Sequence, residues 1–164
     1  MRRVPNTFPA RRRADRDWER PGNAWIVTIG RMTDDSRVRH IDTQVRLARA
    51  VVENLRPAEL AAELQAGDVV LVDLREPDEL GAGTIGGAIN VPRGIVELVA
   101  DPDRPDHCSV LDPRRRVVVF CDNGERSALA VHALYTLGYS DVAHLDGGLA
   151  AWVADGRALT ANVG

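Results

Sequence analysis

The sequence contains no lysine, and all 21 of its basic residues are arginine. Cysteine is scarce too: among 164 residues only Cys108 and Cys121 are present. Two cysteines with no secretory apolar segment upstream do not suit a disulfide framework, so we expect free thiols in a reducing cytoplasm. Neither cysteine has histidines at zinc-finger spacing, so we predict no metal and no other cofactor.

Long apolar runs are also missing, since no stretch approaches the roughly 18 to 20 residues that cross a bilayer. We therefore expect no membrane partner. Charge is uneven: residues 1–31 carry eight arginines against three acids, a net of +5, whereas residues 32–164 carry thirteen against twenty-one, a net of −8. Because the larger part of the chain is acidic, we also expect no nucleic-acid partner.

The N-terminal part shows two different patterns. Residues 1–31 have no sustained period of 2 or 3.6, and we interpret them as a flexible basic extension; a start of translation at Met32 would place them upstream of the native chain. Residues 32–50 predict an amphipathic helix, whose apolar stripe we expect to pack on the protein's own body in a monomer or weak homodimer. The stripe consists of Val38, Ile41, Val45, Ala48 and Val52.

Residues 51–164 alternate short apolar runs with helical patterns. We predict strands over 51–55, 69–73, 88–91, 117–120 and 142–145, and helices over 57–66, 94–100, 127–137 and 149–154. Continuous valine-rich strands alternating with helices indicate an α/β fold of three layers, with a mostly parallel sheet of about five strands flanked by helices. In such folds ligands lie beyond the carboxyl ends of strands, where Cys121 and the segment Asp73-Leu74-Arg75 both fall.

The stretch from Val117 to Ser127, VVVFCDNGERS, has the pattern of a reactive thiol site. A buried strand fixes the position of the Cys121 sulfur, and Gly124 allows the backbone to curl its N–H groups inward. The helix that follows adds unpaired N–H donors with positive dipole character, which favour a thiolate over a thiol. The planar guanidinium of Arg126 can complete the cradle around an anionic sulfur species.

Three motifs in order resemble the rhodanese-like sulfurtransferase family, over roughly Val51 to Leu159. Val69 to Pro92 is similar to the family's first motif, with Asp-x-Arg-Glu at a strand end. Cys121 to Arg126 is similar to its catalytic loop, Cys-x-x-Gly-x-Arg. Leu145 to Trp152, LDGGLAAW, is similar to its C-terminal motif.

The resemblance implies a sulfurtransferase that moves a sulfane sulfur, from thiosulfate or a persulfide on a small molecule or protein, to a thiol or cyanide. Cys121 is then the nucleophile and persulfide carrier, and Asp73 orders its own turn. Thr84 stands where the family often has His, and we expect it to be a scaffold residue. The implied substrate-binding residues are Asp122, Asn123, Gly124, Glu125, Arg126, Ser127 and, near the pocket mouth, Arg75.

One departure from the family bears on the donor. Asp122 and Glu125 are acids in a loop where many thiosulfate-using members carry basic residues, and their field opposes a dianion. We therefore hypothesise that thiosulfate is a poor donor and that a less charged persulfide is preferred.

Two other functions remain open from the sequence. A non-catalytic rhodanese-like binding module is one, although such modules usually lose the cysteine. A phosphatase or arsenate reductase is the other, but those loops place five residues between Cys and Arg, against four here. The segment His107-Cys108 followed by Arg114 fits the pattern His-Cys-x5-Arg; we reject it because no strand precedes Cys108, and Pro113 lacks an amide donor. We expect Cys108 to be an incidental loop cysteine.

Overall fold

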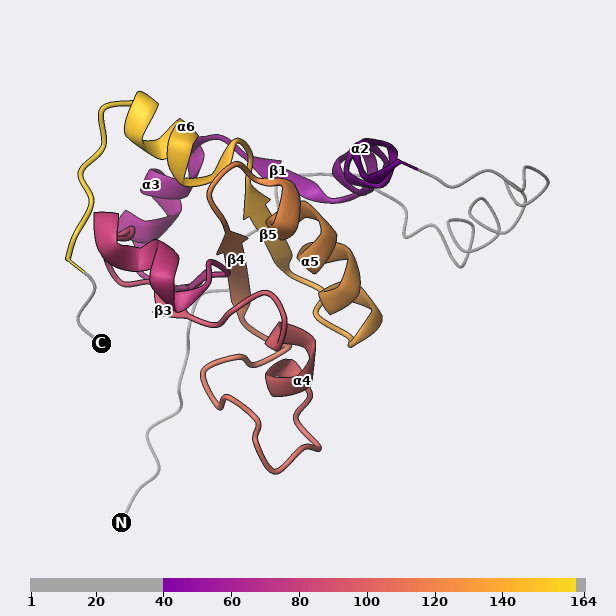
Figure 1. Ribbon diagram of the computed structural model, residues 1–164. Coiled ribbons are helices and arrows are strands. Elements are labelled where there is room, and N and C mark those ends of the chain that lie inside the picture. The colour runs from indigo at the N-terminus through magenta and orange to yellow at the C-terminus, as the bar shows by residue number, and fades with distance from the viewer. Residues whose placement is uncertain (1–39, 162–164) are drawn as a thin grey trace, which may run out of the picture. The chain divides into compact units, whose positions relative to one another are not determined.

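The computed structural model describes residues 40–161 (Figure 1). Our predictions for residues 1–31, for Met32 and for the part of the helix before residue 40 lie outside the described residues. Over residues 40–161 the chain forms a five-stranded, entirely parallel sheet of order β1-β5-β4-β2-β3. The predicted α/β class is confirmed. The strands are β1 (Glu53–Leu55), β2 (Val69–Asp73), β3 (Ile89–Asn90), β4 (Arg116–Phe120) and β5 (Val142–Leu145).

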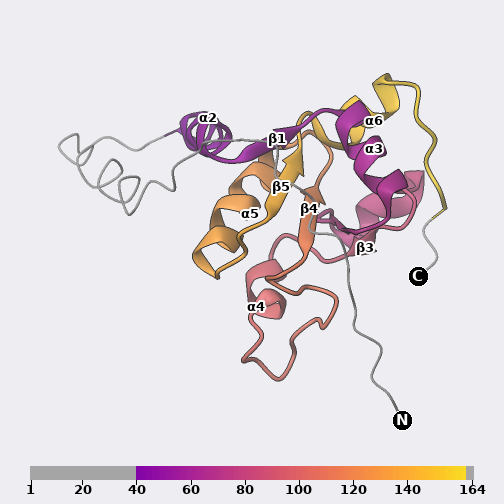
Figure 2. The ribbon, with the colours of Figure 1, turned by 180° about the vertical axis from the view of Figure 1, so that it is seen from behind.

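Helices cover both faces of this sheet, as the two opposite views show (Figures 1 and 2). One face carries α4 (Val96–Ala100) and α5 (Glu125–Thr136), and α2 (Ile41–Val51) packs against α5. The other face carries α3 (Pro57–Ala66), α6 (Gly148–Ala154) and the 3₁₀-helix η1 (Pro77–Ala82). The sequence analysis missed η1.

Strand β4 lies at the centre of the sheet and divides its side chains between two apolar clusters. Val117, Val119 and Cys121 belong to the cluster on the α5 face. Val118 and Phe120 belong to the cluster on the α3 and α6 face. This alternation follows from the period of two in a strand, and it aims the Cys121 sulfur toward the face that α5 covers.

The boundary between α2 and β1 differs from the prediction. Val51, assigned to a strand from the sequence, is the last residue of α2 and is largely exposed, and β1 begins at Glu53. Val45 and Ala48 are buried, which confirms that the described part of the stripe packs on the protein's own body. Ile41 is exposed at the start of the helix.

A long connection over residues 101–115 joins α4 to β4. Its shape is held from inside by Tyr139, whose hydroxyl donates to the carbonyl oxygens of Ala100 (2.9 Å) and Leu111 (2.8 Å). Burial raises the pKa of Tyr139 to about 12, so the phenol stays protonated and available as a donor. No helix among residues 40–161 is long and apolar enough to cross a membrane.

Candidate active site

Cys121 follows the last residue of β4 and opens a tight loop that runs straight into α5. Gly124 is the N-cap of α5 and has φ +84°, a left-handed conformation that side-chain-bearing residues rarely adopt. The loop carbonyls are fixed by the start of α6: Leu149 N donates to Cys121 O (2.8 Å) and Ala150 N to Asp122 O (3.0 Å). The loop is therefore held between two helix starts.

Gly148 belongs to the segment that resembles the family's C-terminal motif, and a side chain at this position would collide with the Cys121 loop. Its φ is +61°, and a Cβ there would lie 2.5 Å from Asp122 O. Such a contact is shorter than real Cβ atoms show, so the loop and α6 approach each other only because residue 148 lacks a side chain.

The backbone amides of the loop and of the first turn of α5 follow Cys121 directly. Arg126 and Ser127 lie in the first turn of α5, where backbone N–H groups have no intrahelical acceptor. The amide of Glu125 is engaged locally, donating to Asn123 Oδ1 (3.1 Å). Cys121 Sγ lies 3.9 Å from the same Asn123 oxygen, and the whole cysteine residue is buried.

Arg126 is held in place by Glu79, a residue of η1. Its two terminal nitrogens donate to the two Glu79 carboxylate oxygens, each at 2.6 Å. Hydrogen bonds from Arg126 lower the pKa of Glu79 to about 2, and Glu79, followed by the Cys121 sulfur, raises the pKa of Arg126. The guanidinium therefore stays charged beside the sulfur, in an orientation that a residue 47 positions away determines.

The structure corrects the expectation for Arg75. This side chain does not lie at a pocket mouth: it is buried and paired with Asp73 at 2.6 Å. Its remaining N–H groups donate to the carbonyl oxygens of Glu79 (3.0 Å) and Gly83 (2.8 Å). With its donors committed in this way, Arg75 is a structural residue that orders the segment after β2.

The other two expectations for this segment are confirmed. Asp73 Oδ1 accepts the Arg75 amide at 3.0 Å, so Asp73 orders its own turn. The hydroxyl of Thr84 donates to Asp73 Oδ2 at 2.8 Å, and Thr84 forms an antiparallel bridge with Thr160. Thr84 is therefore a scaffold residue.

Two parts of the site were not found from the sequence. The first is Arg49 of α2, which donates to Asn123 O at 3.2 Å and lies 3.8 Å from Asp146. It brings a second positive charge to the edge of the loop, from 74 positions earlier in the chain. The helical stripe predicted that α2 packs on the body, but it gave no sign of which polar residue would face the loop.

The second missed part is His144 of β5. It is fully buried on β5, and its Nδ1 lies 3.2 Å from Ser127 Oγ. The same Ser127 oxygen lies 3.8 Å from Cys121 Sγ. A histidine inside the otherwise apolar run Val142 to Leu145 is the signal that could have pointed to it.

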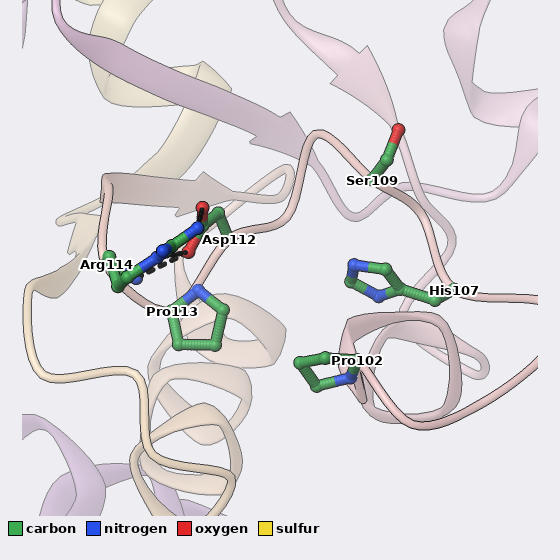
Figure 3. A pocket seen from close by; sticks show the side chains of 6 residues that line it. All are labelled: Pro102, His107, Ser109, Asp112, Pro113 and Arg114. Carbon is green, nitrogen blue, oxygen red and sulfur yellow. Dashed lines mark hydrogen bonds and ion pairs between the residues drawn. The ribbon is translucent and has the colours of Figure 1, made fainter.

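The segment His107-Cys108 to Arg114 forms no cradle. His107 and Arg114 line an open pocket together with Pro102, Ser109, Asp112 and Pro113 (Figure 3). Arg114 is paired with Asp112 at 2.7 Å, and the chain then enters β4 instead of a helix. This confirms the rejection of the phosphatase pattern at Cys108.

The site is the junction of a strand, a loop and a helix in an α/β fold, with a buried cysteine beside a fixed arginine. The family model of the rhodanese-like domain matches residues 56–155. The chain therefore belongs to the rhodanese-like domain family of sulfurtransferases. Helix α2 and its Arg49 lie outside the matched residues.

Individual proteins agree with this assignment. The chain is 35% identical over 97 residues to a sulfurtransferase of Allochromatium vinosum, a match that covers 59% of this chain and 83% of that protein. A solved structure from Rhodopseudomonas palustris, described as a protein of unknown function and possible tyrosine phosphatase, is similar with a TM-score of 0.71 and 32% identity; the match covers 77% and 98% of the two chains. The solved structure of the polysulfide-sulfur transferase homodimer of Wolinella succinogenes is similar with a TM-score of 0.60 and 30% identity, and the match covers 74% of this chain and 87% of that one.

Proposed function

We propose that this protein transfers sulfane sulfur through a persulfide on Cys121. The observation that carries the proposal is the junction of β4 and α5, where Cys121 lies at the foot of a loop beside the fixed guanidinium of Arg126. Amides from the first turn of α5 and a charged arginine stabilise an anionic outer sulfur. The substrate-binding set is the loop from Asp122 to Ser127, without Arg75.

The reaction is a double displacement. The Cys121 thiolate attacks the sulfane sulfur of the donor; a new S–S bond forms, and the donor leaves with the electron pair of the broken bond, as sulfite or as a thiolate. The acceptor, a thiol or cyanide, then attacks the outer sulfur, and Cys121 departs as the thiolate. Because Cys121 is buried, small donors reach it most easily, although a mobile persulfide-bearing tail of a partner protein meets the same requirement.

We further propose that the donor carries little charge. Asp122 and Glu125 are exposed on the loop, and the carboxylate of Glu79 offsets part of the positive field of Arg126. Arg49 offsets only part of this negative field, since it lies near Asp146. A persulfide on a small thiol or on a protein in the reducing cytoplasm suits this site better than dianionic thiosulfate, with the enzyme acting as a monomer or weak homodimer.

The proposal is tested by intact mass after incubation with thiosulfate and, separately, with a small-molecule persulfide. We expect a gain of one sulfur that cyanide removes, that is larger with the persulfide, and that is absent in Cys121→Ser but retained in Cys108→Ser. No adduct from either donor would overturn the proposal and favour a binding module. Hydrolysis of a phosphate monoester by the wild type would instead support a phosphatase.

Donor choice is tested by replacing both loop acids, Asp122→Asn with Glu125→Gln. We expect thiosulfate kcat/KM to rise about threefold to tenfold, because a dianion approaches a less negative loop. The matched control removes two exposed acids away from the loop, Asp68→Asn with Asp103→Asn. No rise in the loop variant, or an equal rise in the control, would contradict the proposed donor preference.

A further inference from the structure

A chain of polar contacts leads from the Cys121 sulfur through the protein to α2. Sγ lies 3.8 Å from Ser127 Oγ, which lies 3.2 Å from His144 Nδ1. On the other side of the ring, His144 Nε2 lies 2.8 Å from Asn54 Oδ1. Ser127 and His144 are fully buried, and they come from α5 and β5, while Asn54 belongs to β1.

The direction of these hydrogen bonds is set by Asn54. Its Nδ2 donates to Arg49 O (2.9 Å) and Val52 O (2.8 Å), so its Oδ1 must face the histidine. An amide oxygen only accepts, and therefore His144 Nε2 carries a proton. In the neutral ring Nδ1 is then an acceptor.

The acceptor at Nδ1 determines where the Ser127 hydroxyl points. Ser127 Oγ lies 3.2 Å from both Gly124 O and His144 Nδ1. Gly124 O has a donor in Ala128 N whichever way the hydroxyl turns, whereas the buried Nδ1 has Ser127 Oγ as its donor, so we assign the hydroxyl proton to the ring. The Ser127 lone pairs are then free to accept the S–H proton of Cys121.

Resting on the proposed function, we propose that Ser127 and His144 form a proton relay that takes up the thiol proton when Cys121 attacks the donor. The S–H proton passes to Ser127 Oγ as the Ser127 proton passes to His144 Nδ1, which leaves a thiolate and an imidazolium. When the acceptor removes the outer sulfur, the same protons return and the thiol is restored. Ser127 contacts the reacting sulfur, and His144 is a positioning residue that acts through it.

Both protonation states keep every member of the chain hydrogen-bonded. Before transfer the Cys121 thiol donates to Ser127 Oγ, and the Ser127 hydroxyl donates to His144 Nδ1. After transfer His144 Nδ1 donates to Ser127 Oγ, and the Ser127 hydroxyl donates to the thiolate. The bond from His144 Nε2 to Asn54 Oδ1 is the same in both states. A buried network that is satisfied in both states needs no rearrangement of heavy atoms. This is the requirement that a group must meet to hold a proton during one half-reaction and return it in the next.

The surroundings keep the ring neutral at rest. Burial lowers the pKa of His144 to about 4; Asp146, which follows β5, acts against this shift, and Arg49 of α2 acts with it. Two other charged or titratable groups stand near the chain, Cys121 at its end and Arg126 beside the sulfur. The neutral ring therefore takes a proton only together with the formation of a thiolate one hydroxyl away, whose charge stabilises the imidazolium.

The test compares His144→Asn with the wild type in single-turnover loading of sulfur over a range of pH. Asparagine can offer Ser127 an acceptor but cannot take a proton. We expect the loading rate of the variant at neutral pH to fall on the order of tenfold, and to recover to within about threefold of wild type in alkali, where bulk base removes the thiol proton. His40→Asn, at the exposed N-cap of α2, is the matched control and should keep the wild-type profile.

Ser127→Ala provides a second variant, with the exposed Ser140→Ala as its control. It should show the same shift of the pH profile. The profile is also measured with iodoacetamide in place of the sulfur donor, resolving Cys121 from Cys108 by mass spectrometry, so that a failure of sulfur transfer does not obscure the relay. Rates that fall equally at every pH, or do not fall, in both variants would overturn the relay and leave the two residues as packing.

Discussion

Cys121 and Cys108 each precede an arginine by a few residues, but the two segments join β4 at opposite ends. After Cys121 the chain leaves the carboxyl end of the strand and enters α5, whose first N–H groups face the loop. After Cys108 the chain runs through Pro113 and Arg114 into the amino end of the same strand. The first segment leads from a strand into the first turn of a helix, and the second is an irregular connection that leads into a strand.

The arginines of the two segments differ in what holds them. Arg114 is paired with Asp112, two positions earlier, on the surface. Arg126 is paired with Glu79, which the fold brings from a distant segment, beside the sulfur. A short motif therefore becomes a site when the fold fixes it from several directions. Substitutions that remove one contact of the Cys121 loop at a time, each beside a matched substitution elsewhere, test this difference between the two cysteine segments.

The largest effect is expected where α6 meets the loop. Gly148→Ala places a Cβ against Asp122 O and forces a left-handed conformation on a residue that resists it. We expect a loss of roughly 2–4 kcal/mol in the free energy of unfolding, measured by denaturant titration.

Gly94→Ala is the matched control for this change. Gly94 lies in the turn before α4, the helix that leads into the 101–115 connection, and a Cβ there meets no atom within 4 Å. We expect it to change stability by less than about 1 kcal/mol in either direction. Equal losses at the two glycines would show that the loop is not held more tightly than the connection.

The second effect concerns the two arginines. Arg126→Ala removes the cation beside the sulfur and leaves Glu79 without its partner, and we expect sulfur-transfer kcat/KM to fall on the order of a hundredfold. Arg114→Ala should stay within about twofold of wild type, because its pair with Asp112 is on the surface. Steady-state kinetics on both variants measures these losses. A similar loss of kcat/KM in Arg126→Ala and Arg114→Ala would show that the arginine beside the sulfur has no special role.

Much of the fold was accessible from the sequence because its signals are local. The run VVLVD and the run Val117 to Phe120 predicted β2 and β4, and the helices predicted over 127–137 and 149–154 end close to where α5 and α6 stop. The same locality explains the error at Val51, where a β-branched residue suits either the last turn of a helix or a strand. Tertiary packing of α2 on α5 decided between them.

The contacts that hold the site together could not be predicted from local sequence patterns. Arg126 and Glu79 lie 47 positions apart, Ser127 and His144 lie 17 apart, and Arg49 and Asn123 lie 74 apart. No period in the sequence links such pairs, since only the order of the strands brings them together. Arg75 was misassigned for the converse reason: a charged residue after a strand suits an open site, and nothing local shows that carbonyls from two turns enclose it.

A third, smaller effect is expected from Glu79→Gln, which keeps a partner for Arg126 but removes its charge. We expect about a tenfold loss of activity at neutral pH, since charge-assisted hydrogen bonds are roughly twice as strong as neutral ones. Hydrogen bonds from Arg126 lower the pKa of Glu79 to about 2 in the folded protein. The carboxylate therefore stabilises the fold above the ordinary pKa of about 4.3, and this contribution is lost as pH falls toward 2.

Acid unfolding measures that contribution. The wild type should lose stability between pH ~4.3 and ~2 more steeply than Glu79→Gln, whose amide does not titrate. Glu97→Gln, which alters the half-buried pair of Glu97 on α4 with Arg93, is the control for a local ion pair. If the two variants give the same acid profile, Glu79 is an ordinary surface partner and not a brace of the loop.

The smallest effect concerns the 101–115 connection. Tyr139→Phe removes the hydroxyl that donates to Ala100 O and Leu111 O, and we expect a loss of about 1–2 kcal/mol in stability with activity within about twofold of wild type. Burial raises the pKa of Tyr139 to about 12, above the ordinary value of about 10. The phenol therefore contributes stability that is complete below pH ~10 and is lost as pH rises through ~12, so the wild type should weaken in alkali more steeply than Tyr139→Phe. Loss of sulfur transfer in this variant would show that the connection, remote from the loop along the chain, supports the site as well, and would remove the distinction between the two cysteine segments.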